Sequence, residues 1–305
     1  MMNGSLTESA VLAEGLVKSY GKVKALGGVS LDVRHGETFG IIGPDGAGKS
    51  TLFRLLTSLL VPDRGSAQVE GLDTVKDYRE IRKIIGYMPG KFSLYQDLTV
   101  EENLTFFATL FGTTIDENYH LIEDIYKQIE PFKARMAGKL SGGMKQKLAL
   151  CCALIHKPKV LFLDEPTTGV DPVSRKEFWD MLGRLKNDGI TILVSTPYMD
   201  EAGRCDRIAL IRNGKFLTVN SPAGIIAEFP DRLYSVRSDR MHALLGDLRA
   251  YSGTIRAFSF GESVHLSTGD GFSEDDLRKF LQDRKHNNVE INAIRPSVED
   301  CFMRI

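Results

Sequence analysis

The stretch from Gly43 to Thr51 is the sequence feature that most constrains how this chain folds. It reads Gly-Pro-Asp-Gly-Ala-Gly-Lys-Ser-Thr and fits G-x-x-x-x-G-K-[ST], the pattern of a phosphate-binding loop. Its glycines let successive backbone N–H groups approach phosphate oxygens more closely than a Cβ would allow. The predicted nucleotide-binding residues of this loop are Gly43, Pro44, Asp45, Gly46, Ala47, Gly48, Lys49, Ser50 and Thr51. Lys49 is expected at the β- and γ-phosphates and the Ser50 hydroxyl on Mg²⁺.

The segments on either side of this loop support the interpretation. Thr38–Ile42 is a short apolar run typical of a buried strand. Apolar residues then recur at helical spacing from Leu52 to Leu60, and Pro62 is expected to stop that helix. A strand, a glycine loop and a helix in this order place phosphate at a helix N-terminus. A glycine-rich turn without a ligand is the alternative that this context disfavours.

A second strand carries two adjacent carboxylates. Val160–Leu163 is a continuous apolar run, as in a parallel sheet covered on both faces, and it ends in Asp164 and Glu165. Carboxylates at the end of a buried strand are costly unless they meet a cation or a proton. We expect Asp164 to hold Mg²⁺ through water and Glu165 to orient the attacking water as the catalytic residue. An acidic turn before Pro166 is the plainer alternative.

The third motif, Leu140–Gln146, reads Leu-Ser-Gly-Gly-Met-Lys-Gln. Ser141 is a good N-cap for a helix whose apolar residues recur from Lys145 to Ile155. Gly142 and Gly143 would open that helix without side chains, so its N–H groups and positive dipole end can face a γ-phosphate. A capped helix without a ligand would not need the glycine pair.

Together these motifs resemble the ATP-binding-cassette (ABC) ATPases, and more narrowly the ATP-binding subunits of ABC-2-type exporters, over residues 11–224. The resemblance implies an α/β P-loop NTPase fold with a mixed sheet, a β-rich edge and a helical insert at about 91–157. It implies ATP and Mg²⁺ as ligands, a second ABC cassette as partner and an integral-membrane ABC-2-type permease. Tyr20 would stack on adenine, and Thr168–Asp171 matches the D-loop. The signature residues that would contact the partner's ATP are Ser141, Gly142, Gly143, Met144 and Gln146.

The chain departs from the family pattern at two positions. The family has Gln at the end of the predicted strand Ile84–Pro89, where this chain has Gly90. It has His after Thr191–Thr196, where this chain has Pro197, which offers neither a side-chain donor nor a backbone N–H. Loss of one preorganised donor typically costs about 10²–10³ in rate. We therefore expect intact ATP binding but slow hydrolysis. Asp45 replaces the commoner Asn and is expected to point outward or to pair with a cation.

Residues 8–224 are predicted as the ABC domain and residues 230–305 as a small α+β accessory domain. In the latter, the predicted order is strand, helix, two strands, helix and strand. We interpret it as a dimerisation or regulatory addition.

Three expectations concern particular segments. Residues 11–39 are expected to form short strands, and Asn213-Gly214 a hairpin turn. Within the helical insert, an apolar face is expected to pack in the core; its residues are Phe106, Phe107, Leu110 and Phe111. The segment Phe92–Val100 is expected to receive a helix of the membrane subunit, unless it packs only on its own insert.

Composition narrows the class of partner. The 39 Lys and Arg residues nearly balance the 40 Asp and Glu residues, so no long-range attraction to nucleic acid is expected. No apolar stretch approaches the roughly 20 residues of a membrane span, and no signal peptide is apparent. The four cysteines form no metal-binding pattern, and Cys151 and Cys152 are expected in the core. The sequence thus predicts a reduced protein on the cytoplasmic face of a membrane, held there by its permease.

Three functions remain open at this point. The first is a subunit whose ATP-driven pairing with another cassette powers an exporter. The second is a largely non-hydrolytic cassette that presents its signature motif to an active partner. The third, a soluble ABC factor acting on ribosomes or DNA, is disfavoured by the single cassette and the absence of a basic arm.

Overall fold

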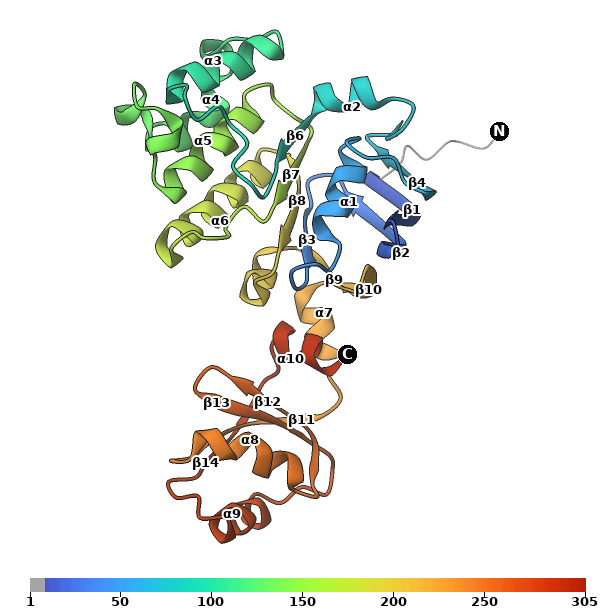
Figure 1. The fold of residues 1–305 in the computed structure, drawn as a ribbon, viewed down its shortest axis with the longest axis vertical. Helices are drawn as coiled ribbons and strands as arrows, with labels where there is room; N and C mark the ends of the chain where they lie inside the picture. Colours follow the sequence, from blue (N-terminus) through green and yellow to red (C-terminus); the bar gives the residue numbers. More distant parts are fainter. Residues whose placement is uncertain (1–8) are drawn as a thin grey trace. The chain divides into compact units, whose positions relative to one another are not determined.

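The apolar runs predicted as buried strands form one mixed sheet in the computed structural model, which describes residues 9–305 (Figure 1). Its strand order is β10-β9-β3-β8-β7-β6. The strands are β3 (Thr38–Ile42), β6 (Ile85–Met88), β7 (Val160–Asp164), β8 (Thr191–Thr196), β9 (Arg207–Arg212) and β10 (Lys215–Asn220). All neighbouring pairs are parallel except β9 and β10, which form the predicted hairpin at Asn213-Gly214. The carboxyl ends of β3, β7 and β8 therefore meet at one edge.

A second, antiparallel sheet has the order β2-β1-β4-β5. Its strands are β1 (Ser9–Tyr20), β2 (Val23–Arg34), β4 (Arg64–Val69) and β5 (Leu72–Asp73). The expectation of short strands is wrong for β1 and β2, which are 12 residues long each. β1 and β2 pair with each other as a long antiparallel ribbon that packs on the core. The pairing register shifts at several points along the ribbon, where β-bulges interrupt it.

Helix α1 (Lys49–Leu56) packs its apolar side chains between the two sheets (Figure 1). It ends well before Pro62, where the sequence placed its end. The Thr57 hydroxyl donates to the Phe53 carbonyl, and Ser58 has a left-handed φ of 57°. These two features end the helix at this point, because a residue with a left-handed φ cannot continue a right-handed α-helix.

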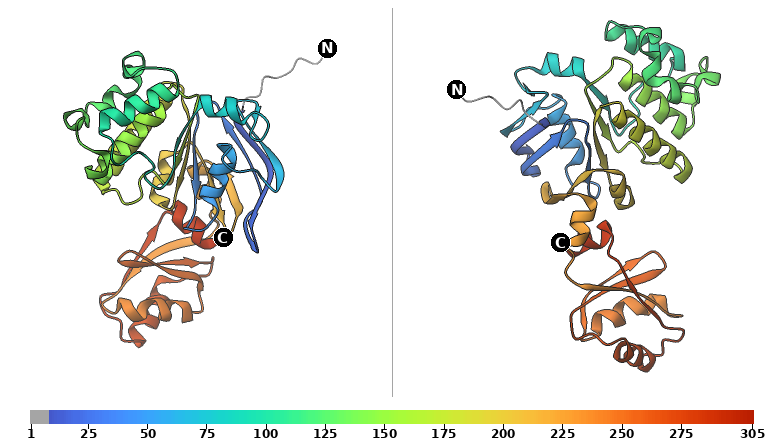
Figure 2. Two further views of the ribbon diagram at one scale, coloured as in Figure 1. Left: turned by 45° about the horizontal axis from the view of Figure 1, so that its top comes forward. Right: turned by 180° about the vertical axis from the view of Figure 1, so that it is seen from behind.

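The remaining helices of the first unit are largely at one side of the central sheet, where α3, α4 and α5 gather (Figure 2). They are α2 (Tyr78–Ile84), α3 (Val100–Leu110), α4 (Ile115–Tyr126), α5 (Gly142–Leu154) and α6 (Pro172–Asn187), with short 3₁₀ turns η1 (Glu130–Phe132), η2 (Ala137–Lys139) and η3 (Met199–Arg204). Capping boxes at Thr99 and Thr114 start α3 and α4. Cys151 and Cys152 are buried on α5, as predicted.

The predicted core face of α3 is wrong. Leu110 is 62% exposed and Phe106 39% exposed, while Phe107 and Phe111 are only partly buried. The buried face of α3 is instead built from Val100, Asn103, Leu104 and Ala108. Helical spacing identified an apolar stripe, but its members Phe106 and Leu110 are exposed, while Phe107 and Phe111 lie at the edge of the buried face.

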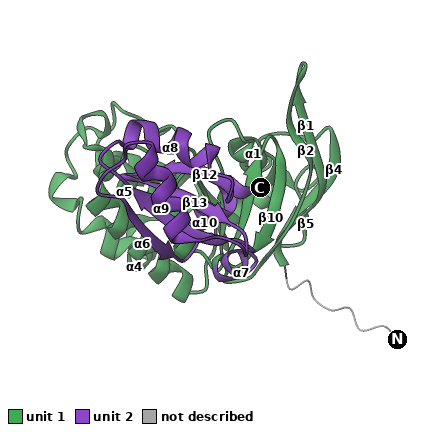
Figure 3. Cartoon of the chain, turned by 90° about the horizontal axis from the view of Figure 1, so that it is seen from below, with its two compact units in different colours: residues 1–222 green, residues 223–305 purple. Residues whose placement is uncertain are grey.

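The chain divides between Pro222 and Ala223 into two compact units (Figure 3). Residue 8, where the first domain was predicted to begin, lies outside the described residues. In the second unit, the predicted order of strands and helices is confirmed after α7 (Pro222–Ala227). The elements are β11 (Arg232–Arg237), α8 (Met241–Ala250), β12 (Thr254–Phe260), β13 (Ser263–Thr268), α9 (Glu274–Asp283), β14 (Glu290–Ile294) and a further helix, α10 (Val298–Arg304). The sheet order is β12-β13-β11-β14, and α8 and α9 contribute to its core.

Within residues 9–305, none of the helices combines the length and the apolar character needed to cross a bilayer.

Candidate functional site

The loop from Gly43 to Gly48 connects the fully buried strand β3 to α1. Gly48 is the N-cap of α1, with a left-handed φ of 107°, and a Cβ there would lie 2.5 Å from the Ala25 carbonyl oxygen. Only glycine fits both the conformation and the space. Gly43 is equally confined, since a Cβ would lie 2.1 Å from the Ile211 carbonyl oxygen. The loop is thus pressed against neighbouring backbone and keeps a fixed shape.

Lys49 places one buried charge under this loop. Its side chain is 3% exposed, and its Nζ donates to the carbonyl oxygens of Gly43 at 2.8 Å and Pro44 at 3.0 Å. The Oε1 atom of Glu165 lies 3.0 Å from the same Nζ. Asp45 is 3.9 Å away with a side chain that is largely exposed, which agrees with the expected outward orientation and pairing with a cation.

A cavity of about 570 Å³ and another of about 410 Å³ lie on the first unit, and the smaller surrounds the loop. The smaller one brings together seven predicted site residues: Tyr20, Gly46, Gly48, Lys49, Ser50, Thr51 and Glu165. Tyr20 is 46% exposed at the end of β1, so its ring is available for stacking. Gly43, Pro44, Asp45, Ala47 and Asp164 lie outside the cavity lining; Gly43 and Pro44 act through their bonds to Lys49.

The pairing of β7 with β8 sets the two carboxylates. Asp164 lies opposite Ser195 in the sheet, is buried, and accepts a 2.6 Å hydrogen bond from the Ser195 hydroxyl. The Glu165 N–H donates to the backbone carbonyl and the hydroxyl of Ser195, both at 3.0 Å. Glu165 has a left-handed φ of 52°, which turns it from the strand end toward Lys49. Such outliers concentrate at functional sites.

The donor set at this edge suits Mg²⁺. Mg²⁺ favours hard oxygen ligands and usually takes one or two carboxylates together with substrate phosphates and waters. The Ser50 hydroxyl and the Asp164 carboxylate provide such oxygens. The described residues contain no group of three or more His, Cys, Asp or Glu side chains placed to hold a metal by themselves. The Ser50 hydroxyl and the Asp164 carboxylate fit Mg²⁺ as two of its oxygen ligands, with phosphate and water as the others.

The two departures from the family pattern lie beside these carboxylates. A Cβ on Gly90 would stand 3.1 Å from the Asp164 carbonyl oxygen, so this glycine approaches the carboxylate-bearing turn closely. Pro197 directly follows β8, and the Thr196 hydroxyl accepts a 3.0 Å bond from the Tyr198 N–H across it. Neither position supplies a side-chain donor to the site.

The signature motif forms the start of α5. Ser141 is its N-cap, as predicted, and its hydroxyl accepts from the Met144 N–H at 3.3 Å. Gly142 and Gly143 form the first turn, with Met144 and Gln146 following on α5. A Cβ on Gly143 would lie 3.2 Å from the Ser174 hydroxyl oxygen of α6. None of the residues lining the 410 Å³ cavity comes from this motif.

Asp171 of the D-loop is the N-cap of α6. It accepts from the N–H groups of Val173 at 3.1 Å and Ser174 at 3.0 Å. Hydrogen bonds from Ser174 hold the pKa of the Asp171 carboxyl below its usual range. This carboxylate stays ionised at the head of a helix whose dipole favours it.

Sequence reasoning missed part of the cavity wall. The additional lining residues are Val23, Lys24, Ala25, Asn213 and Gly214. The Asn213-Gly214 pair was recognised only as a turn, yet the Gly214 N–H donates to the Ala47 carbonyl at 2.9 Å and Gly214 accepts from Gly27 at 2.7 Å. A hairpin signal predicts local shape but not the distant loop that the turn supports.

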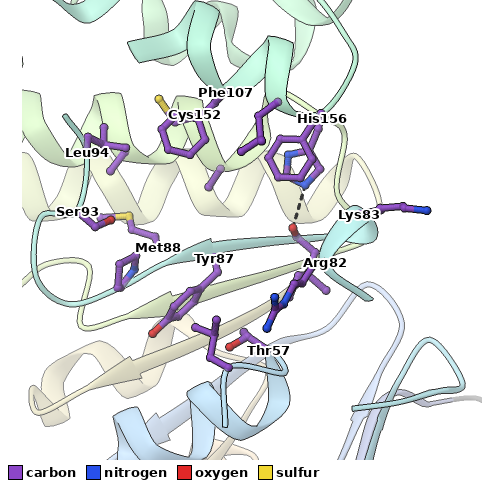
Figure 4. Close-up of a pocket in the computed structure, with 17 residues that line it drawn as sticks. Thr57, Arg82, Lys83, Tyr87, Met88, Ser93, Leu94, Phe107, Cys152 and His156 are labelled. Carbon is purple, nitrogen blue, oxygen red and sulfur yellow. Dashed lines mark hydrogen bonds between the residues drawn. The ribbon is translucent and has the colours of Figure 1, made fainter. Parts of the chain in front are cut away.

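The 570 Å³ cavity is mainly apolar and lies where the helical insert meets the central sheet (Figure 4). Phe107, Leu110 and Phe111 reach it from α3 and its end, and Leu94 from the segment before it. His156 lines it as well, with its ring stacked on Phe111 at 3.8 Å and its Nε2 2.8 Å from the Ile85 carbonyl oxygen. Burial lowers the pKa of His156 from its usual 6.5. Arg82 and Lys83 supply its basic rim.

Residues 26–168 match the family described as ABC transporter. The Nod factor export ATP-binding protein I of Rhizobium sp. (strain N33) is 34% identical over 304 residues, covering 98% of this chain and 98% of that protein. This chain belongs to the ABC transporter ATP-binding proteins.

Other similarities give the same family for this ABC protein. The probable multidrug ABC transporter ATP-binding protein YbhF of Escherichia coli (strain K12) is 37% identical over 308 residues, which cover 98% of this chain. The chain spans 52% of that relative's length. The dimeric structure of MJ0796, a bacterial ABC transporter cassette, is 26% identical with a TM-score of 0.63, covering 69% of this chain and 98% of that one. The fold is accordingly that of an ABC ATPase cassette.

Proposed function

We propose that this ABC protein binds ATP·Mg²⁺ in the 410 Å³ cavity and gates or powers an ABC-2-type exporter, with weak hydrolysis at its own site. The observation that carries the proposal is the arrangement at Lys49. Its buried ammonium is held by loop carbonyls, lies 3.0 Å from Glu165 Oε1, and lines one cavity together with Ser50 and Thr51. Tyr20 at the cavity margin would stack on the adenine ring.

Each residue has a physical task in this proposal. The loop N–H groups and Lys49 would bind the β- and γ-phosphates, and Ser50 and Asp164 would hold Mg²⁺. When bound, Mg²⁺ would neutralise part of the negative charge of the phosphates. Glu165 would accept the proton of the attacking water. Because Gly90 and Pro197 provide no donor, the water and the γ-phosphate are held by fewer groups than in a complete cassette.

Pairing with a second cassette completes the proposal. Ser141, Gly142 and Gly143 would face the ATP of that cassette, with the N-terminus of α5 directed at its γ-phosphate. A pair in which this chain presents an intact signature but a weak site would be asymmetric. The dimeric arrangement is known for the cassette MJ0796, whose structure has been solved as a dimer.

The first experiment measures ATP·Mg²⁺ affinity by calorimetry. Lys49→Ala should weaken binding about 10- to 100-fold, because contacts to a charged group are worth roughly 1.5–3 kcal/mol. Lys279→Ala, an exposed lysine on α9 of the second unit, serves as the matched control and should bind as the unmodified chain does. Undiminished affinity in Lys49→Ala would remove the assignment of Gly43–Thr51 as the nucleotide site.

The 570 Å³ cavity supports the exporter over a soluble factor. Its mainly apolar lining, with the exposed Leu110, forms a groove, and apolar grooves at the surface mark binding sites. Within Phe92–Val100, Leu94 is buried and Tyr95 is 51% exposed. The Tyr95 ring packs edge-to-face on the ring of Phe106. Two hydrogen bonds of 3.0 Å hold that segment in place. The Tyr95 N–H donates to Asn103 Oδ1, and Asn103 Nδ2 donates to the Tyr95 carbonyl oxygen. We infer that a short helix of the permease lies in this groove.

Cysteine cross-linking in native membranes tests this docking. All four cysteines of the chain are buried, so Tyr95→Cys would provide a new accessible thiol. It should cross-link to an integral-membrane protein encoded with this cassette, identified by mass spectrometry. Val75→Cys, exposed but outside the groove, should not. Cross-links from Tyr95→Cys only to soluble proteins would favour a soluble ABC factor instead.

A further inference from the structure

A buried carboxylate, Glu201, has no part in the chemistry described above. It lies in the first turn of η3, and it is 2% exposed. Its Oε1 accepts from the Thr167 hydroxyl at 2.8 Å, and its Oε2 accepts from the Thr196 hydroxyl at 2.5 Å. A carboxylate is costly to bury unless hydrogen bonds replace its water. Thr167 lies in the segment that follows β7, and Thr196 is the last residue of β8.

On the β8 side, Thr196 is bonded on three sides. Its hydroxyl donates to Glu201 and accepts from the Tyr198 N–H at 3.0 Å, which closes a turn around Pro197. Its backbone carbonyl accepts from the Gly43 N–H at 3.2 Å. Thr196 therefore joins Glu201 to the first residue of the phosphate-binding loop.

On the β7 side, Thr167 lies between Glu165 and the D-loop. Its carbonyl accepts from the Val170 N–H at 3.2 Å, one residue before Asp171, the N-cap of α6. Hydrogen bonds thus run without interruption from the D-loop through Thr167, Glu201 and Thr196 to Gly43.

Arg175 of α6 reinforces the same turn. Its guanidinium carbon lies 4.0 Å over the Tyr198 ring, and its Nε lies 3.8 Å from Glu201 Oε1. This buried Nε makes no hydrogen bond with any of the described residues. Its charge therefore acts on the carboxylate through space, from the helix that the D-loop starts.

We propose that Glu201 is a positioning residue that fixes the turn at Pro197 to the D-loop, so that a displacement of the D-loop reaches the phosphate-binding loop. The proposal rests on the proposed function, since it assigns a use to the D-loop at a nucleotide site. Its chemistry is specific: one buried carboxylate accepts a hydrogen bond from both hydroxyl groups. With Pro197 in place of an imidazole, Glu201 and Thr196 are the groups that fix this turn.

Near-isosteric variants separate this role from simple stability. Thr167→Val and Thr196→Val each remove one hydroxyl donor, and Thr167→Ser and Thr196→Ser keep it. Thr191→Val is the matched control, because Thr191 is equally buried at the opposite end of β8, where its hydroxyl accepts from the Gly36 N–H. Amide hydrogen exchange of the full chain without nucleotide measures how firmly the turn at Pro197 and the D-loop are held in the same experiment.

Thr167→Val should speed exchange of the Tyr198 amide about tenfold, although the Thr167 hydroxyl reaches that turn only through Glu201. Thr196→Val should likewise speed exchange of the Val170 amide. The serine variants and Thr191→Val should leave both amides unchanged, and the double valine variant should be no faster than the faster single one. Loosening confined to the segment that carries each substitution would overturn the proposal.

Nucleotide then separates the two proposals. In the unmodified chain, ATP·Mg²⁺ should slow exchange at Val170; in Thr196→Val that protection should disappear while the affinity measured by calorimetry stays within about twofold. Protection that survives in Thr196→Val would contradict transmission through Glu201. If the unmodified chain fails to bind ATP, the proposed function fails, but the exchange comparison without nucleotide still decides whether Glu201 joins the two segments.

Discussion

At the scale of single residues, the proposed chemistry depends on the relation between Lys49 and Glu165. Their charged atoms are 3.0 Å apart, and Glu165 reaches this position with a left-handed φ of 52°. A non-glycine residue in that region has a conformational cost, which the hydrogen bonds that the Glu165 N–H donates to Ser195 must offset. The conformation suits a carboxylate directed at the phosphate-binding loop.

Glu165→Gln keeps this shape and removes the negative charge. ATP·Mg²⁺ should bind at least as tightly, because a carboxylate near phosphate is repulsive, while single-turnover hydrolysis should fall about 10²-fold. Glu290→Gln, on the exposed side of β14, is the control and should change neither quantity. An unchanged hydrolysis rate in Glu165→Gln would mean that another group activates the water.

The sequence predicts the residues of the phosphate-binding loop far better than the residues that hold the neighbouring segments in place. Gly48 is required by its own φ and by a neighbouring carbonyl, and a short motif records such local demands. Ser195 and Glu201 act through partners about 30 residues away, on strands whose pairing no local pattern specifies. Residues of this second kind become visible only when β7 and β8 are placed side by side.

At the scale of elements, periodicity predicted strands β3 and β7 and helix α5 but misjudged the packed face of α3 and the end of α1. The stripe on α3 is apolar at helical spacing, yet Leu110 is largely exposed and faces the groove. A pattern shows that a face is apolar, not what covers it. The same limit applies to α1, whose end is set by the conformation of Ser58 rather than by Pro62.

His156 in this groove gives a prediction of pH dependence. Burial lowers its pKa from 6.5, against the opposing effect of its bond to Ile85. The unfolded chain therefore binds more protons, and the free energy of unfolding should fall as the pH drops through about 6.5 toward the lower folded pKa. Between about pH 7.5 and 5.5, the wild-type Tm should fall more than that of His156→Gln, which keeps a donor for Ile85.

The exposed His242 provides the control for this measurement. His242→Gln should retain the full wild-type loss of Tm at low pH. If His156→Gln and the wild-type chain lose the same Tm over this range, another group is responsible and the burial of His156 has no such consequence.

At the scale of the whole molecule, the two units differ in what their sequences reveal. The fold of the first unit can be predicted from its phosphate-binding-loop motif and the motifs around it. Its cavity is lined by residues from β1, the loop, the segment after β7 and the β9–β10 turn. The second was predicted from alternating elements alone, and its core forms as that order requires. It carries no motif comparable to the phosphate-binding loop, so its dimerisation or regulatory use stays a prediction.

The rate of ATP hydrolysis by the purified chain tests the central claim, a nucleotide site with weakened catalysis. The comparison is with Pro197→His alone and with Pro197→His combined with Gly90→Gln. The first variant is included because a side chain at Gly90 must displace the Asp164 carbonyl region slightly, given the 3.1 Å spacing. Turnover by the unmodified chain should be slow, and restoring the two side chains should raise it about 10²-fold. Turnover already as fast as in the restored variants, or no gain in either, would contradict it.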